Sequence, residues 1–203
     1  MKKILLVGGG GHAHSVIDII EENLEFKIAG IIEPVNKSRT DVLGYPILGE
    51  DSNIEALLVN IPYGIVSVGQ IKSAKTRKKL FGLLSKFGAK IPNIVSKYAY
   101  ISKRSSFERG SVILHGSVVN SGAKIGSNVI INNMALIDHD VTIGDHTHIS
   151  TGARINGYVS IENECFIGSG AILKQGIKIG ANSFITAGSL VTKDLAPNTY
   201  FKE

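Results

Sequence analysis

The chain has 203 residues, of which 43% are hydrophobic, enough for one domain or two small ones with packed cores. Its formal charge of +5 favours anionic partners, namely nucleic acid, an acidic membrane surface or phosphorylated small molecules. The sequence has no Trp and no basic run interleaved with aromatic residues, which argues against nucleic acid.

The sequence shows no sign of export or of a membrane span. No stretch approaches the roughly 18 unbroken apolar residues that a spanning helix needs, and the start is too Gly-rich and polar for a signal peptide. The single Cys165 excludes an internal disulfide framework, which agrees with a reducing compartment. We therefore expect a cytoplasmic protein without membrane insertion.

The first part of the chain alternates predicted strands and helices. Residues 2–23, "KKILLVGGGGHAHSVIDIIEEN", predict a strand, a Gly-rich turn and a helix. "FKIAGIIE" and "YGIVSVG" predict two more strands, and "SAKTRKKLFGLLSKFG" predicts a helix. A short helix between them has a candidate capping box from Ser52 to Glu55. The alternation predicts a small parallel sheet of Rossmann type over residues 1–92.

The Gly-rich turn indicates a phosphate site. Gly8, Gly10 and Ala13 match G-x-G-x-x-A directly after a strand, and Glu33 ends the next strand, where an acidic residue often meets a ribose. A dinucleotide site normally needs two such halves, whereas this domain supplies one, so a mononucleotide is the better hypothesis. The alternative is that the glycines only let strand and helix pack closely.

From Val95 to Val191 every sixth residue is apolar without a break. Four residues after each of these the side chain is mostly small or β-branched, as in Ala123 and Val129. Amphipathic helices repeat near 3.6 and hairpin strands near 2, so a period of six is typical of the hexapeptide repeat of a parallel β-helix. The repeat predicts a β-helix over residues 93–203, after Pro92 ends the α/β pattern.

The stretch "IDHDVTIGDHTHIS", residues 137–150, concentrates histidines and aspartates. His139 stands two places after the inward Ile137, so it should project outward beside Asp140, as a general base near neutral pH requires. One alternative is that these residues only provide a polar outer surface for the β-helix. Another is a metal site built on His146 and His148, although no Cys or Glu set completes a ligand group.

Cys165 raises the possibility of a covalent acyl-enzyme. It stands four places after Ile161, where the small inward residues stand. A thiol buried in apolar surroundings keeps a high pKa and stays unreactive. Direct transfer of an acyl group between substrates is therefore preferred to a route through a covalent acyl-enzyme.

The unbroken hexapeptide repeat resembles the left-handed β-helix acyltransferases. The stretches "VGGGGHAHSVIDI", "VSVGQ…TRKKL" and "IDHD…GDHTHISTGARING" resemble one branch, the bacterial sugar acetyltransferases. That branch includes nucleotide-sugar N-acetyltransferases of surface-glycan pathways and sialic acid O-acetyltransferases. The resemblance covers nearly the whole chain, and it alone implies left-handed coils and a homotrimer.

The resemblance also implies roles for individual residues. His139 matches the catalytic base and Asp140 the acidic neighbour that raises its basicity. The positions that match contacts to acetyl-CoA are His148, Gly157 and Ala187, the last through its backbone at the thioester end. Asn132 matches a contact to the acceptor, and Glu33 matches a contact to the nucleotide base. The phosphate loop is matched by Gly10, Gly11 and His12, and the loop after a later strand is matched by Gly69.

Two departures from the branch bear on the ligands. The usual acidic pair is replaced by Glu33 and Pro34, which leaves the nucleotide and the acceptor open. The chain ends "APNTYFKE" without the usual Gly-x-Pro-Ala tail, so we expect a weaker hold on the CoA nucleotide.

The residue patterns predict an α/β domain followed by a parallel β-helix and no metal site, and the resemblance implies left-handed coils and acetyl-CoA as co-substrate. The expected reaction transfers an acetyl group to the amino group of a nucleotide-linked amino sugar. O-acetylation of a sialic acid or related sugar is the alternative within the enzyme class. A non-catalytic nucleotide-binding scaffold and a metal-dependent hydratase are alternatives from other classes.

Overall fold

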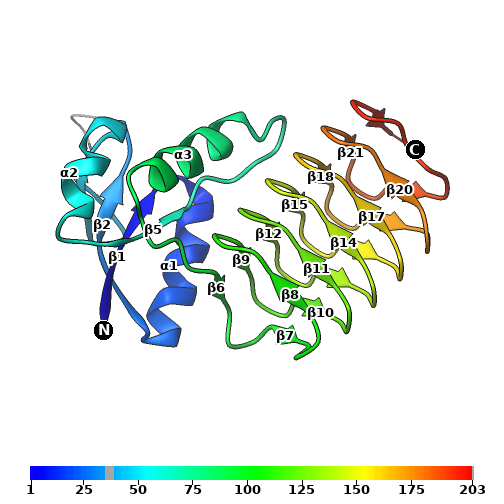
Figure 1. Cartoon of the computed structure of the whole chain (residues 1–203), viewed down its shortest axis with the longest axis horizontal. Coiled ribbons are helices and arrows are strands. Elements are labelled where there is room, and N and C mark those ends of the chain that lie inside the picture. Colours follow the sequence, from blue (N-terminus) through cyan, green and yellow to red (C-terminus); the bar gives the residue numbers. More distant parts are fainter. Residues whose placement is uncertain (35–38, 203) are drawn as a thin grey trace. The chain divides into compact units, whose positions relative to one another are not determined.

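The computed structural model describes residues 1–34 and 39–202. The chain forms two compact units, Met1–Gly69 with Lys75–Ile94 and Gln70–Ala74 with Val95–Glu203. Figure 1 shows helices around a sheet in the first unit and stacked coils in the second. The short segment Gln70–Ala74 groups with the coils although it lies between two elements of the first unit, a detail that the sequence pattern does not indicate.

The first unit contains a five-stranded sheet in the order β3-β4-β2-β1-β5. Neighbouring strands are parallel except for β3 and β4. The elements are β1 (Lys2–Val7), α1 (Gly11–Asn23), β2 (Phe26–Ile32), β3 (Asp41–Val42), β4 (Tyr45–Gly49), the 3-10 helix η1 (Asp51–Asn53), α2 (Ile54–Leu58), β5 (Tyr63–Val66) and α3 (Lys75–Lys86). The predicted parallel α/β arrangement is confirmed.

The helix α1 forms because its apolar residues recur at helical spacing. Ala13, Val16, Ile17, Ile19 and Ile20 are all buried, while the residues between them are mostly polar. The parallel strands therefore gain a covered, apolar face, and the chain leaves β1 and β2 at the same edge of the sheet. That edge carries the Gly-rich loop and Glu33.

The predicted capping box from Ser52 to Glu55 is wrong. The chain first forms the 3-10 turn η1, so Ser52 already lies inside a helical turn. The box instead joins Glu50 and Asn53, and the backbone N–H of Glu50 donates to Asn53 Oδ1 at 3.0 Å. The hydroxyl of Ser52 donates to Glu50 Oε1 at 3.1 Å.

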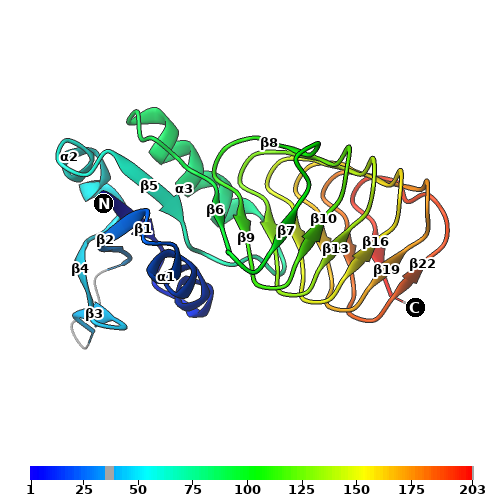
Figure 2. The ribbon, with the colours of Figure 1, turned by 90° about the horizontal axis from the view of Figure 1, so that it is seen from below.

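The second unit is a parallel β-helix of hexapeptide repeats. Val118 pairs with Leu136 and Leu136 with Arg154, so each coil takes 18 residues, or three hexapeptides. Figure 2 shows the coils stacked on one another, with β7, β10, β13, β16, β19 and β22 in one row. We name the three sheets after their first strands.

The strands of these sheets are two residues long. The β7 sheet contains β7 (Tyr100–Ile101), β10 (Val118–Val119), β13 (Leu136–Ile137), β16 (Arg154–Ile155), β19 (Ile172–Leu173) and β22 (Leu190–Val191). The β8 sheet contains β8 (Ser106–Phe107), β11 (Lys124–Ile125), β14 (Thr142–Ile143), β17 (Ser160–Ile161) and β20 (Lys178–Ile179). The β6 sheet contains β6 (Ile94–Val95), β9 (Val112–Ile113), β12 (Ile130–Ile131), β15 (His148–Ile149), β18 (Phe166–Ile167), β21 (Phe184–Ile185) and β23 (Tyr200–Phe201).

The core of the β-helix consists of the residues that the repeat predicts. The second residue of nearly every strand points inward and is buried, as Ile137, Ile143 and Ile149 are. The small residues four places later, such as Ala135 and Ala153, are fully buried as well. These apolar and small side chains fill the interior of each coil. The polar side chains therefore lie on the outside, many of them at the corners between strands.

Candidate active site

His139 lies at the corner between β13 and β14, where the β7 sheet gives way to the β8 sheet. Asp138 begins this corner, and its Oδ1 accepts the backbone N–H of His139 at 2.7 Å. Asp140 ends it in the left-handed region, at φ 58°. Asp and Asn tolerate this conformation better than most residues, because their short polar side chains bond locally. The predicted outward projection of His139 is confirmed.

The two side chains at this corner form a hydrogen-bonded pair. His139 Nδ1 lies 3.0 Å from Asp140 Oδ2, and each side chain is 46% exposed. A carboxylate only accepts hydrogen bonds, so Nδ1 carries the proton and the Nε2 atom of the neutral ring is left with a lone pair. This tautomer suits a general base, because Nε2 can take a proton from an incoming group.

Two residues of the next coil form the wall beside this imidazole. The Tyr158 ring meets the His139 ring edge to face, with centroids 5.0 Å apart. Gly157 is buried beneath His139, and a Cβ atom added to it would lie 2.6 Å from both Cε1 and Nε2. Only glycine leaves room for the ring in this position. Whether Gly157 also contacts acetyl-CoA stays a prediction.

His148 and Asn132 lie at a different corner of the coil. His148 is the first residue of β15 and is only 6% exposed. Its Nδ1 lies 2.7 Å from the backbone O of Gln70, and its Nε2 lies 3.2 Å from Asn132 Nδ2. Gln70 could not be found from the sequence, because its partner is 78 residues away and the contact uses its backbone. The structure therefore pairs His148 with Gln70 and Asn132. Whether His148 contacts acetyl-CoA, and Asn132 the acceptor, stays a prediction.

Ala187 lies at the corner after β21, between the β6 and β7 sheets. It is exposed, and no residue in 1–34 or 39–202 accepts a hydrogen bond from its backbone N–H. A Cβ atom added to Gly168 would lie 2.5 Å from this nitrogen, so Gly168 lets the two corners stack closely. The backbone N–H of Ala187 can therefore donate to an acceptor outside the chain, as the predicted contact to the acetyl-CoA thioester requires.

The Gly-rich loop divides into two parts. Gly8 and Gly9 are tightly packed, since added Cβ atoms would lie 2.3 Å from Val68 Cγ2 and 2.1 Å from Glu33 Oε2. Gly10 and Gly11 are exposed and nothing lies within 4 Å of their added Cβ positions. Close packing thus accounts for the first two glycines, while the last two leave the start of α1 open to a ligand.

The other predicted residues of the first unit surround this loop. The Glu33 side chain is 12% exposed and lies 3.7 Å from Arg39 Nη1, while Arg39 Nη2 donates to the backbone O of Gly9 at 2.9 Å. Gly69 is exposed, and a Cβ atom added to it would lie 3.3 Å from the Cβ of His12. Arg39 was missed because a pairing across a loop has no periodic signal. Contact between Glu33 and a nucleotide base stays a prediction.

Cys165 is fully buried, as predicted. Its thiol donates to the backbone O of Gly180 at 3.3 Å, and burial raises its pKa to about 11. A thiol in this state is almost wholly protonated near neutral pH and is a poor nucleophile. Among the described residues, no group of three His, Cys, Asp or Glu side chains is placed to hold a metal ion. In the same part of the chain, no helix is both long and apolar enough to cross a membrane.

Comparisons with known proteins match both units. Residues 3–84 match the PglD N-terminal domain. Residues 122–157 match the bacterial transferase hexapeptide of six repeats, and residues 158–193 match the hexapeptide repeat of succinyl-transferase.

Solved structures are similar over almost the whole chain. The acetyltransferase domain of PglB from Neisseria gonorrhoeae, in complex with acetyl coenzyme A, is 25% identical with a TM-score of 0.88, over 97% of this chain and 94% of that one. A histidine-to-asparagine variant of perosamine N-acetyltransferase from Caulobacter crescentus, in complex with CoA and GDP-perosamine, is 28% identical with a TM-score of 0.89, over 97% and 91%. WeeI from Acinetobacter baumannii is 24% identical with a TM-score of 0.83, over 97% and 94%, and shows the fold alone.

The two matched domain types, the buried hexapeptide repeat and the similarity to sugar acetyltransferases along the whole chain agree with one another. The fold is a small α/β domain followed by a left-handed parallel β-helix, and along almost its whole length the chain is similar to hexapeptide-repeat acyltransferases of the bacterial sugar acetyltransferase branch.

Proposed function

We propose that this protein transfers the acetyl group of acetyl-CoA to the amino group of a nucleotide-linked amino sugar, in the biosynthesis of a bacterial surface glycan. The observation that carries the proposal is the pair of His139 Nδ1 and Asp140 Oδ2, 3.0 Å apart on an exposed corner. The similar enzyme bound to CoA and GDP-perosamine is an N-acetyltransferase, which supports an amine as acceptor. Because acetyl-CoA and nucleotide sugars are cytoplasmic metabolites, we also place the reaction in the cytoplasm.

In the proposed reaction, the acceptor nitrogen attacks the thioester carbonyl carbon while His139 Nε2 takes one proton from that nitrogen. Asp140 accepts from Nδ1–H and stabilises the imidazolium that forms. The oxyanion of the tetrahedral intermediate receives a backbone N–H, for which Ala187 is the candidate. When the C–S bond breaks, the CoA thiolate leaves and takes the proton from the imidazolium. The buried Cys165 takes no part, so transfer is direct.

The open half of the Gly-rich loop supports a phosphorylated acceptor. Gly10 and Gly11 expose backbone at the start of α1, where helix N–H groups favour anions. Gly69 lies beside His12 in the first turn of this helix. Loop, helix start and Gly69 together would hold the phosphates of the sugar nucleotide, and the formal charge of +5 favours two polyanionic ligands.

We propose further that the active enzyme is a homotrimer whose site is shared between copies. His139 and Ala187 lie on different edges of the β-helix, and Ala187 comes more than two coils later, so one copy cannot bring them to one acetyl group. The outward residues of the β8 sheet are polar, whereas those of the β7 sheet are mostly apolar: Tyr100, Val118, Leu136, Arg154, Ile172 and Leu190. Apolar outer surfaces of this kind favour association.

The reaction is tested by following thiol release from acetyl-CoA across a panel of UDP-, GDP- and dTDP-linked amino sugars and free sialic acids. We expect turnover with an amino-sugar nucleotide and a product one acetyl group heavier that resists hydroxylamine, as an amide does. A hydroxylamine-sensitive product, or turnover with sialic acid alone, would establish O-acetylation instead. If no compound of the panel caused thiol release, the proposal of a sugar acceptor would be contradicted.

The shared site is tested by mixing inactive subunits. His139→Ala removes the base, and Ala187→Glu places a bulky anion where the thioester is expected. If the site lies between copies, co-assembled subunits should recover part of the wild-type activity, because some sites pair an intact His139 with an intact Ala187. Light scattering should show a trimer. An active monomer, or no recovery in verified mixed assemblies, would place the site within one copy.

A further inference from the structure

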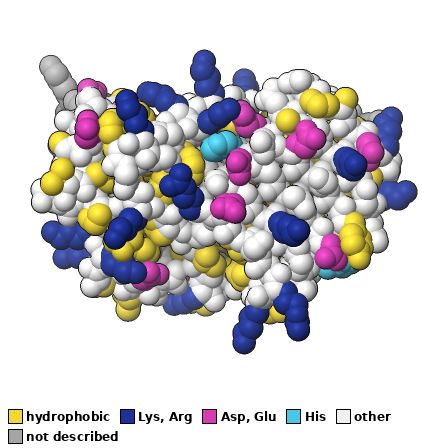
Figure 3. Space-filling model, viewed as in Figure 1, with side chains coloured by type: hydrophobic (Ala, Val, Ile, Leu, Met, Phe, Trp, Pro, Cys, Tyr) yellow, Lys and Arg dark blue, Asp and Glu magenta, His cyan; other side chains and the backbone are white. Residues whose placement is uncertain are grey.

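Arg77 is a cation that the proposed reaction does not use. Figure 3 shows many Lys and Arg side chains on the surface of the protein, whereas Arg77 is 0% exposed. It belongs to α3, which packs beside β5 (Figure 2). Burial lowers the pKa of Arg77 to about 9, so the guanidinium is still charged at neutral pH. Because burying a charge costs free energy, the contacts of this guanidinium are informative.

The guanidinium lies on the inner side of the loop that follows β5. Its Nη1 donates to the backbone O of Val68 at 2.5 Å. This carbonyl and the N–H of Gly69 belong to one peptide unit, and no peptide bond among the described residues is cis. In a trans peptide unit the C=O and the N–H point in opposite directions, so the Gly69 N–H points away from Arg77.

The Gly69 N–H is open to a ligand. Gly69 is exposed, and no residue in 1–34 or 39–202 accepts a hydrogen bond from its backbone nitrogen. Gly69 also lies beside the first turn of α1, since a Cβ atom added to it would lie 3.3 Å from the Cβ of His12. Its N–H is thus at the edge of the sheet where the open glycines begin α1.

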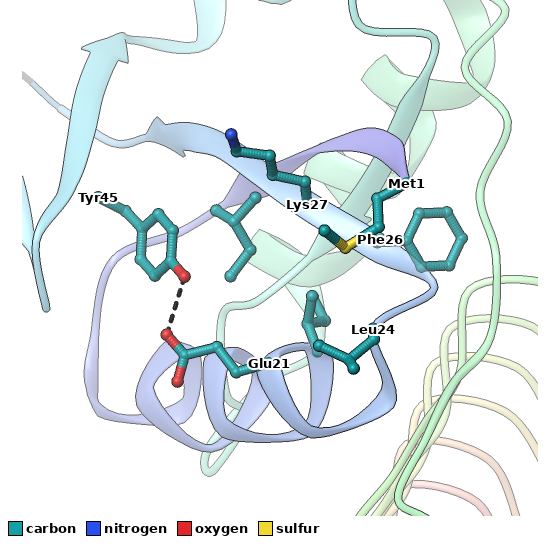
Figure 4. A pocket seen from close by; sticks show the side chains of 8 residues that line it. Met1, Glu21, Leu24, Phe26, Lys27 and Tyr45 are labelled. Carbon is teal, nitrogen blue, oxygen red and sulfur yellow. Dashed lines mark hydrogen bonds between the residues drawn. The ribbon is translucent and has the colours of Figure 1, made fainter.

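The neighbouring Gly-rich loop is held from the inside in the same way. Ser67 is fully buried, and its hydroxyl donates to the backbone O of Gly8 at 2.6 Å. The two loops touch, because a Cβ atom added to Gly8 would lie 3.0 Å from the backbone N of Val68. All of these contacts lie within the first unit. The pocket in Figure 4 lies at the opposite edge of the sheet, where α1 ends and β2 begins, so it takes no part in them.

We propose that Arg77 positions the phosphates of the nucleotide sugar without touching them: its bond to the Val68 carbonyl aims the Gly69 N–H at the phosphates and strengthens it as a donor. A cation at a carbonyl draws electron density from the peptide unit, which makes the N–H a better donor to an anion. Arg77 is therefore a positioning residue. This role rests on the proposed function, in which the Gly69 loop holds these phosphates.

Two variants of Arg77 and a neighbouring control test this role in the kinetics. Arg77→Met has a side chain of similar length with neither charge nor donor, whereas Arg77→Lys keeps both. We expect the KM for the nucleotide sugar to rise about tenfold in Arg77→Met and less than about threefold in Arg77→Lys, since one charge-assisted hydrogen bond is at stake. The kcat and the KM for acetyl-CoA should stay within about twofold. Lys78→Met, which removes an exposed cation from the next position of α3, should resemble the wild type.

Inhibitors separate an effect on the phosphates from a general loosening of the first unit. Inorganic pyrophosphate has phosphates without a base, and the free nucleoside of the sugar nucleotide has the base without phosphates. The Ki for pyrophosphate should rise about tenfold in Arg77→Met, while the Ki for the nucleoside stays within about twofold. The difference should persist in about 0.5 M KCl, because salt screens a buried charge only weakly. An equal rise in both Ki values, or an unchanged KM for the nucleotide sugar, would overturn the proposal.

Nuclear magnetic resonance tests the contact in the wild type without turnover. In the isotope-labelled protein, the Gly69 amide signal should move as pyrophosphate is added, and it should move less in Arg77→Met. A Gly69 signal that does not respond, in an enzyme that acetylates a nucleotide sugar, would refute the role of Arg77 and leave the proposed function in place. A response that depends on Arg77, in a protein that acetylates no nucleotide sugar, would refute the proposed function alone.

Discussion

His139 and His148 stand nine residues apart in one coil, yet the structure treats them in opposite ways. The His139 side chain is 46% exposed and bonds a carboxylate, whereas His148 is 6% exposed and bonds a carbonyl oxygen and an amide. Both carry the proton on Nδ1, because both face an acceptor there. The difference lies at Nε2, which is left for an incoming group in His139 and is engaged by Asn132 in His148.

The comparison shows that environment, more than residue type, decides what a histidine does. A ring with one bonded nitrogen and one accessible nitrogen can move a proton, while a ring with both nitrogens bonded cannot do so without breaking a hydrogen bond. The following experiments test whether His139 and its neighbours act in catalysis, and whether the buried Cys165 does not.

The largest effect is expected at His139. Replacing it with alanine should lower kcat by at least about 100-fold, because a general base typically contributes 10² to 10⁴ in rate. Acetyl-CoA affinity, measured by calorimetry, should stay nearly the same, since the change removes a group that acts in the transition state. Retained turnover in His139→Ala would falsify its assignment as the base.

A smaller loss is expected at Asp140. Asp140→Asn tolerates the left-handed backbone and can still accept from Nδ1–H, but it removes the negative charge that stabilises the imidazolium. Because the pair is half exposed, we expect kcat to fall about tenfold rather than by the larger factors seen in buried dyads. Steady-state kinetics at saturating substrates measure this. Full activity would mean that the carboxylate only orients the ring.

The next effect concerns the glycine beneath the base. A Cβ in Gly157→Ala would lie 2.6 Å from His139 Nε2, so the ring must shift, and we expect kcat to fall about fivefold through misplacement of the base. The KM for acetyl-CoA should change little. A rise in that KM with normal kcat would instead support the predicted cofactor contact. Gly82→Ala is the matched control, because nothing lies within 4 Å of its added Cβ.

Cys165 should matter for stability and not for turnover. Cys165→Ala should keep full activity, and incubation of the wild type with acetyl-CoA alone should leave no acetylated enzyme detectable by mass. Burial raises the thiol pKa to about 11, above the ordinary value of 9.0, so the unfolded chain releases this proton first as pH rises. The wild type should therefore lose about 2 kcal/mol more stability than the variant between pH 9 and 11 in denaturant titrations. Equal losses would contradict a buried thiol.

Most of the fold could be predicted from the sequence, because each of its two parts has a regular, recognisable sequence pattern. A repeat of six over residues 95–191 specified the inward residues of the β-helix, and alternating strands and helices specified the α/β sheet. The capping box failed because sequence spacing does not tell where a 3-10 turn begins, so Ser52 fell inside it.

Only the part of the candidate site that is formed by neighbours in the sequence could be predicted from the sequence. His139 and Asp140 are adjacent in sequence, so their pairing followed once the repeat placed them outside the coil. Gln70 could not be found, because it contacts His148 through a backbone oxygen that every residue possesses. Arg39 bonds Gly9 across a loop, and that contact likewise has no signature in residue type or period.

The corner column that contains Asp140 has a further consequence. Its members one coil apart are Gly122, Asp140, Tyr158 and Gly176, with φ of 77°, 58°, 61° and 78°. Glycine adopts these angles at no steric cost, whereas a side chain there costs of order 1 kcal/mol. Among these four left-handed positions, the two that are not glycine are the ones that support and flank His139. The two side chains beside the base therefore cost stability, and a chain with glycine at both positions should be more stable but a poorer catalyst.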